Sequence, residues 1–205
     1  MSLFGNRRGP IIIGLAVAAG LVAVAFSRPK LNVTSTDNQT SIRQRYAALY
    51  QAAWRQDEGR GATVMTATLL APSIIQTLGQ DTGRSTTEEQ IWNAVNSIDA
   101  RGLAIIITVD SVGGAVPDDT MRGSLTLAAD GGPAMSVDSW RPIIAPSRIV
   151  NTQAAASSQV GIAVFRAAGD IDWPKLGTLR LTVSGIGDQP TRVFTWVEPR
   201  LLLNV

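Results

Sequence analysis

The sequence predicts a mostly-β α+β domain behind a single N-terminal transmembrane helix. Three observations predict this class. An unbroken apolar run covers 10–26. Apolar residues then recur at helical spacing in several segments up to about residue 101. From residue 102 onward, short β-branched segments alternate with Gly/Asp turns, which is typical of an antiparallel β-sandwich.

The apolar run fits two fates. Its 17 residues would form a helix of about 26 Å, at the short end for a hydrocarbon core of about 30 Å. Ala23-Val24-Ala25 instead matches a small-x-small cleavage site of a secretory signal, which would remove about residues 1–25. The residues favour neither fate. We interpret the apolar run as an uncleaved membrane anchor.

This anchor predicts a single-pass protein of the bacterial inner membrane. The basic residues on the two sides of the run are balanced, so the signal-like layout decides for a cytoplasmic N-terminus and a periplasmic bulk. Two small-xxx-small pairs, Gly14 with Ala18 and Ala16 with Gly20, are candidates for close packing against a neighbouring helix. Membrane lipid and other subunits of an integral membrane complex are therefore the expected partners.

The remaining chain is expected to form one domain preceded by a linker. The expected order is a cytoplasmic tail at 1–9, the transmembrane helix at 10–26, a linker at 27–40, the helical and strand-containing N-terminal part of the domain at 41–101, and the sandwich at 102–205. The clearest helix is 41–58, where Ile42, Tyr46, Leu49 and Tyr50 begin one apolar stripe.

The segment 62–101 alternates strand and helix signals. A β-branched strand is expected at 62–70, and Pro72 suits the first turn of a short helix that Gly79 ends. A capping box starts the next helix, because either Ser85 or Thr86 finds a Glu three residues later. That helix is expected to end near residue 101.

The segment 102–205 predicts an Ig-like sandwich, with two or three helices packed on it. The expected strands are 103–112, 123–129, 134–144, 159–168, 176–184 and 191–197. Loops are expected at 113–119 and 169–175, and a long polar connection at 145–158. In the last strand, Val193, Thr195 and Val197 alternate with Phe194 and Trp196.

Several short motifs carry a resemblance. They are Thr68-Leu69-Leu70-Ala71-Pro72, the apolar strand 103–109, Asp130-Gly131 before Trp140, Val164-Phe165, the strand 179–183 and Trp196. In this order the chain resembles uncharacterised bacterial envelope proteins, usually lipoproteins, over most of 62–197. The resemblance implies a β-sandwich outside the cytoplasmic membrane. It carries no functional residues, and the lipid-bearing Cys of that group is missing here.

The composition argues against most catalysis. The chain has no Cys and no His, so it lacks thiolate nucleophiles, Cys-zinc sites and the commonest general base. Asp118-Asp119 and Asp170-Ile171-Asp172 are the best acidic candidates, but both suit turns that bond their own backbone. A net charge of +2 without a basic stripe does not indicate nucleic acid. No catalytic, cofactor or metal residue is predicted.

The leading hypothesis is a non-enzymatic, membrane-anchored periplasmic accessory subunit. It would brace a larger membrane complex, such as a respiratory or photosynthetic assembly. The alternative is a tethered envelope module that binds a peptide, a glycan or another ligand. Trp173 and Pro174, in a loop, are the candidate interface residues, because an exposed Trp often anchors a partner.

Overall fold

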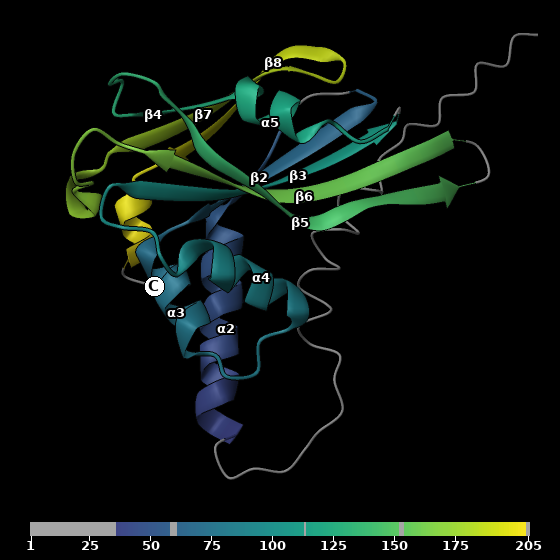
Figure 1. Cartoon of the computed structure of the whole chain (residues 1–205). Coiled ribbons are helices and arrows are strands. Elements are labelled where there is room, and N and C mark those ends of the chain that lie inside the picture. Colours follow the sequence, from purple (N-terminus) through teal and green to yellow (C-terminus); the bar gives the residue numbers. More distant parts are fainter. Residues whose placement is uncertain (1–35, 58–60, 113, 152–153, 204–205) are drawn as a thin grey trace, which may run out of the picture.

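The computed structural model describes residues 36–57, 61–112, 114–151 and 154–203. Within these ranges, eight strands form one antiparallel sheet in the order β1-β2-β3-β6-β5-β4-β7-β8 (Figure 1). The strands are β1 (Trp54–Gln56), β2 (Thr63–Leu70), β3 (Gly102–Val112), β4 (Leu125–Ala129), β5 (Met135–Asn151), β6 (Ala154–Arg166), β7 (Thr178–Ile186) and β8 (Gln189–Val197). The helices are α2 (Thr36–Ala53), α3 (Pro72–Gln80), α4 (Thr86–Val95), α5 (Asp118–Ser124) and the 3-10 helices η1 (Trp173–Lys175) and η2 (Pro199–Leu203).

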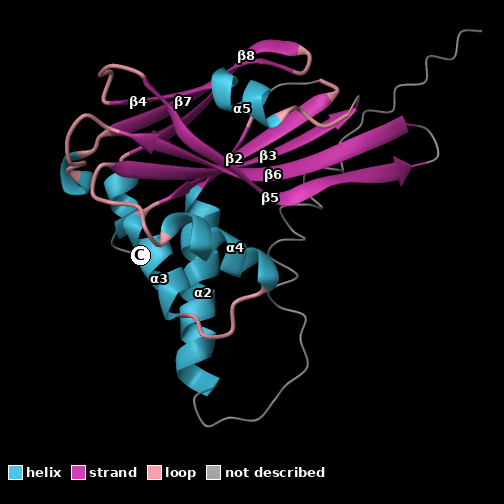
Figure 2. Cartoon of the chain, in the orientation of Figure 1, coloured by secondary structure: helices cyan, strands magenta, loops and turns pink. Residues whose placement is uncertain are grey.

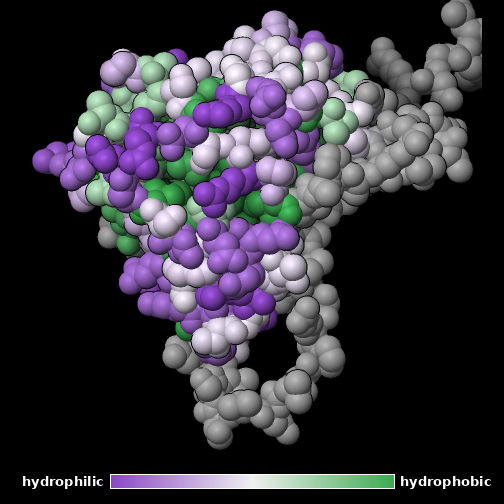
Figure 3. All heavy atoms as spheres, in the orientation of Figure 1, coloured by the Kyte–Doolittle hydropathy of each residue, from purple (hydrophilic) through white to green (hydrophobic). Residues whose placement is uncertain are grey.

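Helices α2, α3 and α4 gather on one side of the sheet, below the strands in Figure 2. Their starts follow from local sequence. Pro72 occupies the first turn of α3, and Ser85 caps α4 in a complete capping box with Glu88. Both predictions are confirmed. On this side of the molecule, Figure 3 shows hydrophobic side chains gathered in a band where the helices meet the sheet.

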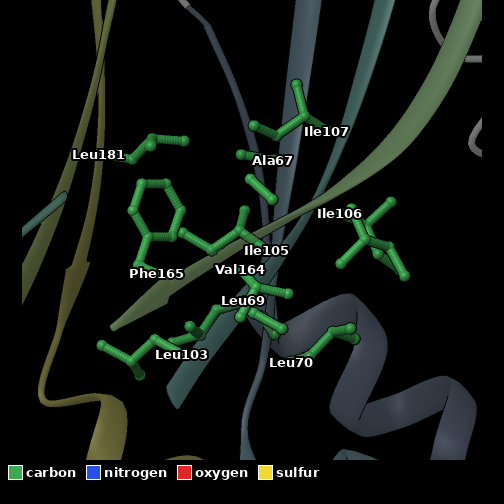
Figure 4. Packing of buried hydrophobic residues seen from close by; sticks show 14 of the residues in the cluster. Ala67, Leu69, Leu70, Leu103, Ile105, Ile106, Ile107, Val164, Phe165 and Leu181 are labelled. Atoms are coloured by element: carbon green, nitrogen blue, oxygen red, sulfur yellow. The ribbon is translucent and has the colours of Figure 1, made fainter. Parts of the chain in front are cut away.

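The central strand β3 is buried on both faces. Successive side chains of a strand point to opposite faces, so Ile105 and Ile107 lie on one face of the sheet and Ile106 lies on the other. In Figure 4, Phe165 of β6 lies beside Leu181 of β7, and Leu70 lies beside a helix. This double burial explains why 103–107 is uniformly apolar, whereas β7 and β8 alternate.

Strand β5 joins the two halves of the sheet. Its first residues, Met135 and Ser136, pair with β4, and from Val137 onward it pairs with β6. Register shifts interrupt the β5–β6 ladder at three places, including Pro142/Ile144. Irregularities of this kind bend a strand and increase its twist. The sheet therefore curves until its two edge strands, β1 and β8, approach each other.

We call the meeting of β1 and β8 the seam. The two strands form no ladder within the described residues, and side chains bridge them instead. Arg55 donates from Nε to the carbonyl of Thr195 at 3.2 Å. The indole of Trp196 donates to the carbonyl of Ala53 at 2.6 Å. These contacts hold the sheet nearly closed.

The structure corrects the predicted Ig-like sandwich. That prediction placed two separate antiparallel sheets face to face, whereas the eight strands belong to one continuous, nearly closed sheet. The reason lies in 145–158, which was expected to be a polar connection. This stretch contains the end of β5 and the start of β6, paired as one long hairpin.

The structure also corrects the predicted single-pass anchoring. No helix among residues 36–57, 61–112, 114–151 and 154–203 is both long and apolar enough to cross a membrane. The expected transmembrane helix at 10–26 lies outside the described residues. The predictions of a transmembrane, single-pass protein and of an inner-membrane location with a periplasmic bulk are therefore not supported.

Three local predictions also change. The helix expected at 41–58 starts at Thr36 and ends at Ala53, because Trp54 pairs with Thr68 as the first residue of β1. The loop expected at 113–119 ends in helix α5, whose first turn carries Asp118 and Asp119. The strand expected from residue 123 therefore starts at Leu125.

Candidate interaction surface

Among the residues whose side chains the structure describes (39–57, 61–111, 114–143 and 157–203), the exposed large hydrophobic side chains lie on one short segment. They are Val193 and Val197 on β8 and Leu201 on η2, which are 50%, 69% and 55% exposed. Their spacing of four residues places the two valines on the same face of β8. Scattered single apolar residues are ordinary on a protein surface, but a group confined to one segment marks a candidate contact surface.

The register of β7 and β8 explains this surface. On both strands every second side chain is buried, and the side chains between them face outward. The buried residues include large apolar side chains such as Leu181, Phe194 and Trp196. We call the outward side of this hairpin the outer face; it consists of Thr178, Arg180, Thr182, Ser184, Thr191, Val193, Thr195 and Val197.

The predicted interface residues Trp173 and Pro174 lie at one end of the outer face. They belong to η1, which contacts η2, the helix that carries Leu201. The Trp173 side chain is half-buried and packs against the core, whereas Pro174 is exposed. Trp173 therefore packs part of its side chain against the core and leaves the rest accessible to solvent. We call the group Trp173, Pro174, Val197 and Leu201 the corner patch.

Paired charges surround the corner patch. Lys175 lies 2.7 Å from Asp172, and Arg200 lies 2.7 Å from Glu198. The Asp172 carboxylate raises the pKa of Lys175 through its hydrogen bond and its charge. An apolar centre with a charged rim is the usual anatomy of a protein–protein interface.

A buried ion-pair network holds β8 in place behind the outer face. Arg192 donates from Nε to Asp57 Oδ2 at 2.7 Å and from Nη2 to Asp188 Oδ1 at 3.0 Å. It also donates to the carbonyls of Thr63 and Ile186. The network thus ties β8 to the end of β1, the start of β2 and the β7–β8 turn.

The two carboxylates of this network shift in opposite directions. Burial raises the pKa of Asp57, although Arg192 opposes the shift. One of its oxygens, Oδ1, is buried and has no hydrogen-bond partner among the described residues. The pKa of Asp188 is lowered, chiefly because the backbone N–H of Ala62 donates to its carboxylate.

Two of the other acidic candidates, Asp118 and Asp172, have partners within the fold. The Asp118 carboxylate accepts from the Trp140 indole at 2.8 Å and from the Gln159 amide at 3.4 Å. Asp172 pairs with Lys175. No group of three or more acidic side chains that could hold a metal occurs in the described part of the chain.

One polar groove lies between the start of α2 and the end of α3. It has a volume of about 530 Å³ and is lined by Gln39, Ser41, Ile42, Arg45 and Gln80. Its size suits a small ligand, but such sites are mostly apolar with a few placed polar groups. Ile42 is the single apolar residue of this lining, so the groove does not have that character.

Comparison with family models, with curated proteins and with solved structures finds no match. The predicted helix-packing residues, Gly14, Ala16, Ala18 and Gly20, lie outside the described residues. The alternation at 191–197 was visible in the sequence. The aromatic residues Phe194 and Trp196 indicate the buried face of this strand, and the alternate residues Val193 and Val197 therefore face outward.

Proposed function

We propose that this chain is a non-enzymatic accessory protein that binds another protein through the outer face and the corner patch. The observation that carries the proposal is that, among the residues whose side chains the structure describes, the exposed large hydrophobics lie on β8 and η2 alone. Covering an aliphatic side chain contributes about 25 cal/mol per Å² of apolar surface. A partner seated on Val193, Val197 and Leu201 would recover that free energy.

The rigidity of the surface supports the proposal. The outer face is the reverse side of a strand whose inward residues Arg192, Phe194 and Trp196 are almost fully buried. A surface fixed in this way loses little conformational entropy on binding, which favours affinity. The outer face is the outward side of a two-stranded hairpin, an extended surface that suits a protein better than a small molecule.

The experiment compares the full chain with a Val193→Thr/Val197→Thr variant. Both chains carry an affinity tag and are purified from the cells that naturally make the protein. Threonine keeps the shape and strand preference of valine but removes apolar surface. We expect a stoichiometric protein partner with the unsubstituted chain and its loss from the variant, with unchanged thermal unfolding.

Thr86→Ala, at an exposed position of α4, serves as the control and should retain the partner. Two results would contradict the proposal. One is an unsubstituted chain that purifies alone and runs as a monomer in light scattering. The other is a double variant that retains the same partner in the same amount.

A further inference from the structure

The outer face carries one charged residue, and it lies between the two exposed valines. Arg180 pairs with Thr195, while Val193 pairs with Thr182 and Val197 pairs with Thr178. Arg180 therefore stands on the neighbouring strand at the level midway between Val193 and Val197. The two valines are about 13 Å apart along β8, at about 3.3 Å per residue.

Within the described part of the chain, no acidic side chain pairs with Arg180. The charged side chains at the corner patch are paired, Lys175 with Asp172 and Arg200 with Glu198. Arg180 is exposed and makes no ion pair or side-chain hydrogen bond among the described residues. A partner that covers the valines also removes water from this guanidinium, and an unpaired buried charge is costly.

We infer that the partner presents one carboxylate flanked by two aliphatic side chains. This inference rests on the proposed function and specifies the partner's chemistry. The carboxylate would accept from the Arg180 guanidinium in a two-pronged pair. The aliphatic groups would cover Val193 and Val197. In an extended segment the matching pattern is aliphatic-x-acidic-x-aliphatic, because alternate residues share a face.

The outer face of a second copy does not have this chemistry. The eight residues of the outer face include neither Asp nor Glu. Two outer faces packed together would therefore bury two guanidinium groups without a carboxylate. Like charges at an interface select against such a pairing.

The test selects displayed random twelve-residue peptides on the immobilised full chain. Parallel selections use Arg180→Glu, Val193→Thr/Val197→Thr and the control Arg141→Glu. Arg141 is an exposed arginine on β5, so its substitution makes the same charge change away from the outer face. Thermal unfolding of every variant is measured first, to establish that each is folded.

We expect the unsubstituted chain and Arg141→Glu to enrich an acidic residue between two aliphatic ones. Arg180→Glu should enrich a basic residue at that position, and it should bind the original peptides about tenfold more weakly or worse. Val193→Thr/Val197→Thr should enrich neither pattern. The selection could instead enrich aliphatic peptides with no acidic residue, and these could bind Arg180→Glu as tightly as the unsubstituted chain. That result would overturn the inference and leave the proposed function standing.

Two further results are also decisive. Peptides whose enrichment does not depend on Val193 and Val197 would overturn both the inference and the proposed function. A dimer of the unsubstituted chain that Val193→Thr/Val197→Thr dissociates would identify a second copy as the occupant. That result would overturn the inference that the partner presents a carboxylate.

Discussion

The Arg192 guanidinium lies 2.7 Å from the Asp57 carboxylate across the seam between β8 and β1. The side chains are only 1% and 4% exposed. Because the two strands share no ladder in the described residues, this pair replaces backbone pairing at the point where the sheet nearly closes. The same arginine also binds two backbone carbonyls and Asp188.

The first prediction concerns this pair. Arg192→Met leaves the buried Asp57 carboxylate without its partner. We expect the free energy of unfolding to fall by about 3–5 kcal/mol, which is typical when one member of a buried pair is removed. Urea unfolding of the full chain, followed by circular dichroism, measures the change.

Two variants control this experiment. The double variant Asp57→Leu/Arg192→Met removes both charges and should recover most of the loss. Arg180→Met, an exposed arginine on the adjacent strand, should change stability by less than about 0.5 kcal/mol. Equal losses in Arg192→Met and in the double variant would show that packing, and not the unpaired charge, sets the cost.

The second prediction concerns Asp110 on β3. Burial raises the pKa of its carboxyl above 3.8, and a hydrogen bond from Ser158 only partly opposes the shift. At pH values between 3.8 and the raised pKa, Asp110 keeps its proton in the folded chain but has lost it in the unfolded chain. The free energy of unfolding therefore falls as pH rises from about 3.8 through the raised pKa.

Asp110→Asn removes this charge, and one oxygen of the carboxylate, Oδ1, has no partner to lose. We expect the substitution to raise the free energy of unfolding at pH 7 by on the order of 1 kcal/mol. The gain should vanish below about pH 4, where the aspartate is also neutral. Asp170→Asn, at an exposed loop position, should show no such trend. A gain that is equal at pH 4 and pH 7 would refute the prediction.

The local structure was largely predictable from the sequence. Caps, prolines and alternation act over a few residues, which is why α3, the start of α4, β7 and β8 were predicted close to their observed places. Helix α4 ends at Val95 and not near residue 101 as expected. The closure of the sheet was not predictable in this way. It depends on β5 crossing between the two halves and on Trp54 pairing with Thr68, and neighbouring residues do not encode such distant pairings.

The candidate surface was only partly predictable. Trp173 and Pro174 were singled out because a loop Trp often anchors a partner, and they lie beside η2. Leu201 was not singled out, because its exposure depends on how η2 packs against α2 and α3. The contact between Arg192 and Asp57 joins residues 135 positions apart. Nothing in the local pattern of either residue indicates the other.

The third prediction concerns Gly161 on β6. The Trp140 side chain covers this glycine, and a Cβ placed there would overlap the indole ring. The same ring is held by its hydrogen bond to Asp118. We expect Gly161→Ala to lower the free energy of unfolding by about 1–3 kcal/mol, as overpacking does.

A double-mutant cycle with Trp140→Leu tests the cause, because the smaller side chain leaves room for the added methyl group. Gly161→Ala should cost much less in that background. Thermal and urea unfolding of the four chains give the coupling free energy. The same cost with and without the indole would mean that backbone conformation, and not the ring, requires glycine.

The fourth prediction concerns the start of α4, where the sequence allowed either Ser85 or Thr86 as the cap. The Ser85 hydroxyl accepts from the backbone N–H of Glu88, and the Glu88 carboxylate accepts from the backbone N–H of Ser85. We expect Ser85→Ala to cost about 1 kcal/mol of unfolding free energy. Thr86→Ala should cost less than about 0.5 kcal/mol, because its exposed side chain is not the cap. Urea unfolding measures both, and an equal loss from Thr86→Ala would contradict the assignment of Ser85.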